Sequence, residues 1–166
     1  MLRKLLQTQN DYAALLVRLG LGLVMFPHGA QKALGWFGGP GIAGTMEGFG
    51  KMGIPPLFAA LAIIAEFLGS IGLVVGLLSR VAAFGIGCVM VVAALMVSLP
   101  NGFFMNWTGN LKGEGYEYHL LAVAMALAVM VRGSGAWSLD YLLTRRAAEG
   151  PVVTGGARAH APAPAA

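Results

Sequence analysis

The residues of this sequence that could move protons stand at the edges and in the middle of strongly apolar segments. His28 and Lys32 lie in the stretch FPHGAQKALGWFGGPG, directly after an apolar run. Glu66 stands inside a second apolar run, and Glu117 and His119 stand at the start of another. An ionisable group within a bilayer costs about 2.5–3.5 kcal/mol or more unless it is paired, so it marks a functional site by default. Histidine titrates near neutral pH, which indicates acid–base chemistry.

The elements that must position these residues are four apolar blocks, at about 12–34, 56–78, 81–99 and 116–132. Hydrophobic residues make up 57% of the 166 positions and charged residues 11%, against about 25% charged residues in an ordinary soluble domain. A helix needs roughly 20 apolar residues to cross the hydrocarbon. The first three blocks have that length, and the fourth reaches it only with its polar start. We predict an all-α fold, an integral membrane four-helix bundle occupying residues 1–148.

The flanks of the blocks predict interfacial helices and an orientation. LRKLLQTQNDY and GAWSLDYLLTRR mix apolar, aromatic and charged residues, as short interfacial helices at the termini do. Residues 149–166 are rich in Ala, Pro and Gly and predict a disordered tail. Basic residues near the helix ends divide into two sets, Arg3, Lys4, Arg80, Arg132, Arg145 and Arg146 on one side and Lys32, Lys51 and Lys112 on the other. The larger set predicts a multi-pass protein of a bacterial inner membrane with both termini in the cytoplasm.

Two of the charges, Arg18 and Glu66, fall well inside the predicted spans. At roughly 1.5 Å per residue they differ in depth by about one helical turn, so long side chains would meet. One interpretation is a buried ion pair that only fixes the first helix against the second. The other places Arg18 beside a bound cofactor. We predict that Arg18 and Glu66 pair, and both interpretations of their role stay open on the sequence alone.

The opening stretch predicts a pocket in the outer half of the bundle. Met25, His28 and Lys32 share one side of a helix at roughly 100° per residue. Pro27 lacks a backbone donor and predicts a kink that turns this side inward. A Gly-rich loop at 35–53 would cover the pocket. The polar or aromatic groups expected around it are His28, Lys32, Trp36, Glu66, Glu117 and His119.

The same stretches resemble a known family. Arg18, FPHGAQKALGWFGGPG and AEFLGSIGLVVGLLSR are similar to the DoxX family of small four-helix membrane proteins, over about 13–132. The similarity includes H-G-x-x-K from His28 to Lys32 and E-x-x-x-x-x-G-L-x-x-G from Glu66 to Gly76. The resemblance implies a link to membrane oxidoreductase systems, including the quinone-reactive small subunit of thiosulfate:quinone oxidoreductase.

The residue types favour a quinone over other redox groups. Cys88 is the single cysteine, so an intramolecular dithiol relay is excluded. Haem held by His28 and His119, or a metal held by the same histidines, fits less well beside the nearby charges, and we predict no metal site. A quinone needs hydrogen-bond donors and a route for protons. We assign catalytic roles to His28, Lys32 and Glu66, and cofactor contacts to Arg18, Trp36, Glu117 and His119.

The function expected from these residues is that of a quinone-associated membrane subunit of an oxidoreductase system. Nothing in the chain stores electrons, so a redox protein partner would have to deliver them, and whether the chain is itself an enzyme stays open. The alternatives are a non-enzymatic anchor or assembly partner for a redox or secreted protein, and a conduit for protons or small molecules. The lipid bilayer is the first partner, association with further copies stays open, and no nucleic acid is expected.

Overall fold

The chain is built of helices throughout the part that can be described. The computed structural model describes residues 5–149, and in this range it has no strand, which confirms the all-α prediction. Residues 1–4 and 150–166, with most of the predicted tail, lie outside the described range. The α-helices are α2 (Tyr12–Leu34), α3 (Gly41–Lys51), α4 (Pro56–Val75), α5 (Ser79–Ala93), α6 (Glu117–Arg132) and α7 (Leu139–Glu149). Shorter pieces are the 3₁₀-helices η1 (Trp36–Gly38) and η3 (Leu99–Asn101) and the π-helix η2 (Ala94–Ser98).

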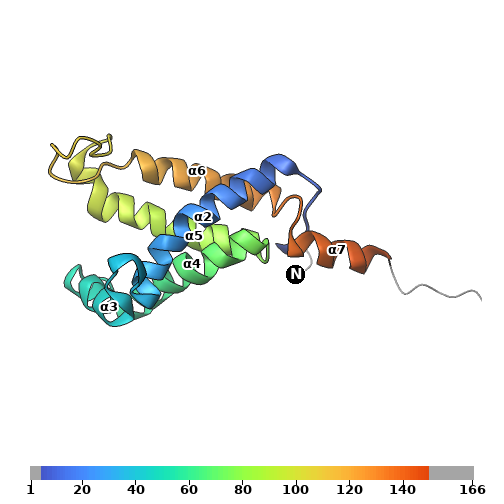
Figure 1. Ribbon diagram of the computed structural model, residues 1–166, viewed down its shortest axis with the longest axis horizontal. Coiled ribbons are helices and arrows are strands. Elements are labelled where there is room, and N and C mark those ends of the chain that lie inside the picture. Colours follow the sequence, from blue (N-terminus) through green and yellow to red (C-terminus); the bar gives the residue numbers. More distant parts are fainter. Residues whose placement is uncertain (1–4, 150–166) are drawn as a thin grey trace, which may run out of the picture.

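The four longest helices pack in a ring. Helix α2 packs against α4 and α6, and α5 packs against the other sides of α4 and α6. Helix α3 and the 102–116 segment lie at one end of this body, and α7 projects from the opposite end (Figure 1). We call these the α3 end and the α7 end. The side chains buried between the helices include Leu21, Met25, Leu73, Ile86 and Ala126.

Three helical stretches are long and apolar enough to cross a membrane. They are Tyr12–Leu34, Pro56–Val75 and the continuous run Ser79–Asn101, which joins α5 to η2 and η3. Their outer faces expose large apolar side chains such as Leu23, Leu68 and Phe84, as expected of a surface in contact with lipid. Helix α6 has 16 residues and is therefore about 24 Å long, shorter than the hydrocarbon layer.

The 35–53 segment is more ordered than the sequence suggested. We expected a Gly-rich loop, whereas the structure contains η1 and the 11-residue helix α3 there. Ile42, Met46 and Phe49 recur at helical spacing, a signal that the surrounding glycines obscured. Thr45 is buried, and its hydroxyl donates to the Lys32 carbonyl at 3.3 Å. This contact docks α3 on the last turn of α2.

The ends of α2 are set by local side-chain and backbone chemistry. Asp11 is the N-cap, and its carboxylate accepts from the Ala13 and Ala14 amides at 2.9 and 3.2 Å. The Arg132 guanidinium also donates to Asp11 and holds the pKa of that carboxyl below its usual range. Gly35 ends the helix in the left-handed conformation, with φ 73°. Between these caps α2 continues through Pro27.

Gly29 sets the distance between α2 and α4. A Cβ atom at this position would lie 2.5 Å from the Phe67 Cα and 2.6 Å from the Glu66 carbonyl oxygen. Because both neighbours are backbone atoms, they are unable to move aside without separating the helices. The sequence pattern H-G-x-x-K therefore contains a glycine that lets two membrane helices touch.

We expect Gly29→Ala to lower the free energy of unfolding by about 1–3 kcal/mol, the usual cost of overpacking. Gly48→Ala is the matched control, since nothing lies within 4 Å of a Cβ built there and alanine favours the helix. Thermal unfolding of both variants in detergent checks the prediction. An unchanged midpoint for Gly29→Ala would mean that the two helices separate at no cost.

Candidate functional site

The last turns of α2 place a lysine against the glutamate in the middle of α4. The Lys32 ammonium donates to the Glu66 carboxylate, and the two form an ion pair. The Glu66 side chain is 3% exposed and the Lys32 side chain 25% exposed. The close approach at Gly29, one turn before Lys32, brings α2 near enough for this contact. Two of the three predicted catalytic residues therefore meet directly.

His28 lies beside this pair at the boundary between α2 and α6. Its ring centroid lies 6.3 Å from that of Tyr118, and the ring is within electrostatic range of Lys32 and Glu66. His119 is within electrostatic range of His28. His28 is exposed at the bundle surface. The cluster of these residues, His28, Lys32, Glu66, Tyr118 and His119, is called the α3-end cluster below.

Two atoms of the α3-end cluster have no hydrogen-bond partner. The Tyr118 hydroxyl and His119 Nδ1 are both buried, and neither has a partner among the described residues. Buried polar groups are nearly always bonded, so each such exception needs an explanation. The two atoms are therefore candidates for hydrogen bonds with a ligand.

Glu117 and Trp36 have other surroundings. The Glu117 carboxylate accepts from the Met105 amide at 2.8 Å and from the Trp107 indole at 3.4 Å. Its role is to hold the 102–116 segment against the start of α6. The Trp36 side chain is 53% exposed and packs edge-on against Phe37, with ring centroids 6.4 Å apart. The structure brings neither residue into contact with Lys32 or Glu66.

The predicted pair between Arg18 and Glu66 is wrong. The buried Arg18 guanidinium donates instead to backbone carbonyls at the end of α4 and in the 133–138 turn. The acceptors are Leu73, Val74 (2.8 Å), Ser134 (2.8 Å), Ala136 (3.4 Å) and Trp137 (3.3 Å). Carbonyls at a helix end lack intrahelical partners, and a guanidinium with five donors satisfies several of them at once. Arg18 is therefore committed to structure at the α7 end, away from the α3-end cluster.

A second buried charge completes the arrangement around Arg18. The Asp140 carboxylate is fully buried and accepts from the Leu78 and Ser79 amides at 2.9 and 3.2 Å, which caps α5. It also accepts from the Ser134 hydroxyl, in the turn whose carbonyl binds Arg18. Asp140 was not among the predicted site residues, because an acidic residue in a predicted interfacial helix is usually solvent-exposed.

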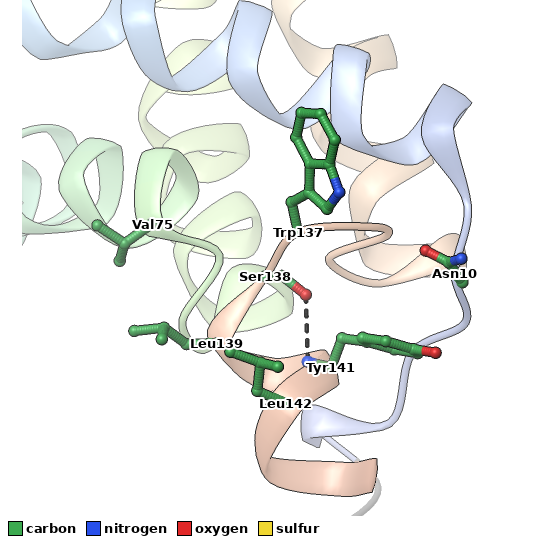
Figure 2. A pocket seen from close by; sticks show the side chains of 7 residues that line it. All are labelled: Asn10, Val75, Trp137, Ser138, Leu139, Tyr141 and Leu142. Carbon is green, nitrogen blue, oxygen red and sulfur yellow. Dashed lines mark hydrogen bonds between the residues drawn. The ribbon is translucent and has the colours of Figure 1, made fainter.

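A cavity of about 390 Å³ lies at the α7 end. Figure 2 shows Val75, Leu139 and Leu142 on one side of it, and Asn10 and the Tyr141 hydroxyl on the other. The Ser138 hydroxyl oxygen in its wall already accepts from the Tyr141 amide at 3.1 Å. Its lining is mostly apolar and contains no carboxylate or histidine, unlike the α3-end cluster.

Residues 13–99 match the sequence model of the DoxX family. The chain belongs to the DoxX family. The matched range contains α2, α3, α4 and α5, and so it includes the Lys32–Glu66 pair. No solved structure matches this DoxX chain at a significant level.

Three curated relatives of the DoxX chain come from different bacteria. CatD of Bacillus subtilis, provisionally named an oxidoreductase, is 28% identical over 130 residues, which cover 78% of this chain and 86% of CatD. The inner membrane protein YqjF of Escherichia coli is 29% identical over 138 residues, covering 82% and 96%. The uncharacterized membrane protein Rv3486 of Mycobacterium tuberculosis is 31% identical over 157 residues, covering 87% and 89%.

Residues 5–149 contain no group of three or more His, Cys, Asp or Glu side chains close enough to hold an ion. Cys88 is a free, exposed cysteine on α5. The chemistry that the α3-end cluster offers is hydrogen bonding and proton transfer.

Proposed function

We propose that this DoxX protein is a membrane subunit of an oxidoreductase system and that it binds a quinone at the α3-end cluster. The observation that carries the proposal is the Lys32–Glu66 pair, with Glu66 3% exposed in the middle of a span-length helix. Two histidines and a tyrosine lie around it, one of them exposed at the bundle surface. A lipid-soluble ligand could thus approach from the membrane and meet titratable groups there.

The residues of the cluster suit the two requirements of such a ligand. A quinone supplies two-electron chemistry and takes up two protons when it is reduced to the quinol. Lys32 can donate a hydrogen bond to a ligand oxygen, because its flexible stem lets the ammonium turn away from Glu66. His28 and Glu66 can hold and pass the protons. The electrons would come from a redox protein partner.

Topology forms part of the proposal. We infer that α6 is a fourth crossing, that the α7 end faces the cytoplasm and that the α3 end faces outward in a bacterial inner membrane. Arg80 and Arg132 lie at the α7 end, whereas Lys51 and Lys112 lie at the α3 end. The name of YqjF, an inner membrane protein, supports the location.

Cysteine labelling tests the orientation. In a Cys88→Ala background, Gln9→Cys should react with a membrane-impermeant reagent only from the cytoplasmic side. Glu47→Cys and Lys112→Cys should react only from the outer side, since all three positions are exposed. A cysteine at position 45 would not report on the outer side, because Thr45 is buried. Labelling of Lys112→Cys from the cytoplasmic side would reverse the topology.

Quinone retention tests the function. We expect the protein purified in native lipid to retain quinone above the level of the surrounding lipid, measured by mass spectrometry of extracted lipids. Glu66→Gln and His28→Ala should lose this excess while remaining folded. Glu47→Gln is the matched control, because it removes a carboxylate from an ion pair with Lys51 whose side chains are 68% and 75% exposed. If the wild-type protein holds no excess quinone, the anchor or assembly role takes its place.

A further inference from the structure

Two buried atoms of the α3-end cluster lack a hydrogen-bond partner in the described part of the chain, and the role inferred for them rests on the proposed function. The Tyr118 hydroxyl and His119 Nδ1 are buried without hydrogen-bond partners. The two residues are neighbours in the first turn of α6. Their ring centroids lie 5.6 Å apart. A buried hydroxyl without a partner destabilises the protein that carries it. Groups that destabilise the folded state in this way are typical of binding and active sites.

The surroundings of Tyr118 combine apolar and titratable groups. Its ring packs at the edge of the hydrophobic core and lies 6.3 Å from the His28 ring. The Glu66 carboxylate is within electrostatic range of its hydroxyl. The hydroxyl therefore lies close to the groups that the proposed function uses, in a place that water reaches poorly.

The span that pairs with the start of α6 is irregular near its end. The Tyr116 amide donates to the Gly102 carbonyl at 3.1 Å and the Glu117 amide to the Phe103 carbonyl at 3.0 Å. This pairing sets the end of the third span level with the start of α6. The π-helix Ala94–Ser98 lies in the last part of this third span. Single π-turns within α-helices are frequent at functional sites, because they redirect the local side chains.

We propose that the Tyr118 hydroxyl is the group that holds an oxygen of the bound ligand, with His119 Nδ1 as a second hydrogen-bonding position. The ligand class is a lipid-soluble ring with oxygen substituents, a quinone or quinol. Tyr118 donates a hydrogen bond to a quinone oxygen, or accepts one from a quinol hydroxyl. His28 and Glu66 then serve proton exchange, while Tyr118 fixes the position of the ring. No bond other than hydrogen bonds forms at Tyr118.

The test separates binding from folding by removing a single oxygen atom. Tyr118→Phe keeps the ring, and Tyr116→Phe removes a hydroxyl two residues away as the matched control. Thermal unfolding of the purified full-length chain is measured without ligand and with decylubiquinone. Without ligand, Tyr118→Phe should unfold at the wild-type temperature or above it, because an unpartnered hydroxyl has been removed. With decylubiquinone, its stabilisation should be lost, reflecting an affinity at least about tenfold weaker, while Tyr116→Phe keeps the wild-type shift.

Other outcomes overturn the inference in distinguishable ways. A Tyr118→Phe variant that keeps the full shift, while Glu66→Gln loses it, removes Tyr118 from the site and leaves the proposed function standing. A lower ligand-free unfolding temperature for Tyr118→Phe would show that the hydroxyl is satisfied, for example by a buried water, and would also overturn the inference. A wild-type protein that decylubiquinone does not stabilise would overturn the proposed function together with it.

Discussion

Replacing Arg18 with leucine should lower the free energy of unfolding by about 3–5 kcal/mol, the cost of removing one member of a buried charged network. The guanidinium donates to five backbone carbonyls. Leucine is shorter than arginine and donates nothing, so these carbonyls would lose their partner in a place closed to water. Denaturant titration in micelles, followed by tryptophan fluorescence, measures the loss. A protein that no longer accumulates in the membrane would show the same effect in cells.

Arg132→Leu is the matched control for Arg18. Both residues are arginines at the α7 end, but the Arg132 side chain is 63% exposed and pairs with Asp11 near the surface. Exposed pairs contribute about 0–1 kcal/mol, so its replacement should change the unfolding curve little. Arg18→Lys should fall between the two, since lysine keeps the charge but has three donors. Equal curves for Arg18→Leu and Arg132→Leu would contradict the structural role of Arg18.

The pair between Lys32 and Glu66 should appear as an asymmetric double-mutant cycle. Lys32→Met leaves Glu66, 3% exposed, without its cation, and we expect a loss of about 2–3 kcal/mol, somewhat less than for a fully buried pair. Glu66→Gln should cost less, because Lys32 is 25% exposed and can turn its ammonium toward the headgroups. The double change Lys32→Met with Glu66→Gln should be milder than Lys32→Met alone. Unfolding of the four proteins under one set of conditions gives the coupling.

The same experiment distinguishes the two partners considered for Glu66. Residues in one ion pair couple by about 0.5–3 kcal/mol, whereas independent sites add within about 0.5 kcal/mol. We expect coupling in the Lys32/Glu66 cycle and additivity in an Arg18/Glu66 cycle. Coupling between Arg18 and Glu66 would mean that the guanidinium leaves the carbonyls of α4 and the 133–138 turn.

Most of the fold could be predicted from hydropathy, because a bilayer forces long apolar helices on the chain. The first helix, for instance, has the bounds 12–34 in both the prediction and the structure. Helix α3 could not be predicted this way, since its four glycines outweigh a helical pattern of only three apolar residues. The order among helices and the side of α2 that meets α4 depend on contacts such as the one at Gly29.

The site was predictable in part, for reasons that differ among its residues. Lys32 and Glu66 were expected near each other because each is expensive in a membrane and needs a partner. The predicted partner of Arg18 was wrong because the guanidinium donates to backbone carbonyls, which every residue carries and no sequence pattern marks. Tyr118 was overlooked because a tyrosine at a helix end is usually an interfacial anchor. Only the absence of a partner for its buried hydroxyl distinguishes it.

The hydrogen bonds of Arg18 set an order of events during synthesis. Three of its carbonyl acceptors lie 116 to 119 residues further along the chain, a stretch that takes on the order of ten seconds to translate. Helix α2 therefore enters the membrane with a guanidinium whose acceptors on α4 arrive first and whose remaining acceptors arrive only after α6. A nascent chain that stops before the 133–138 turn carries a cation in the bilayer that its own backbone does not fully satisfy. Completion of the C-terminal part is thus a condition for the first helix to reach its final state.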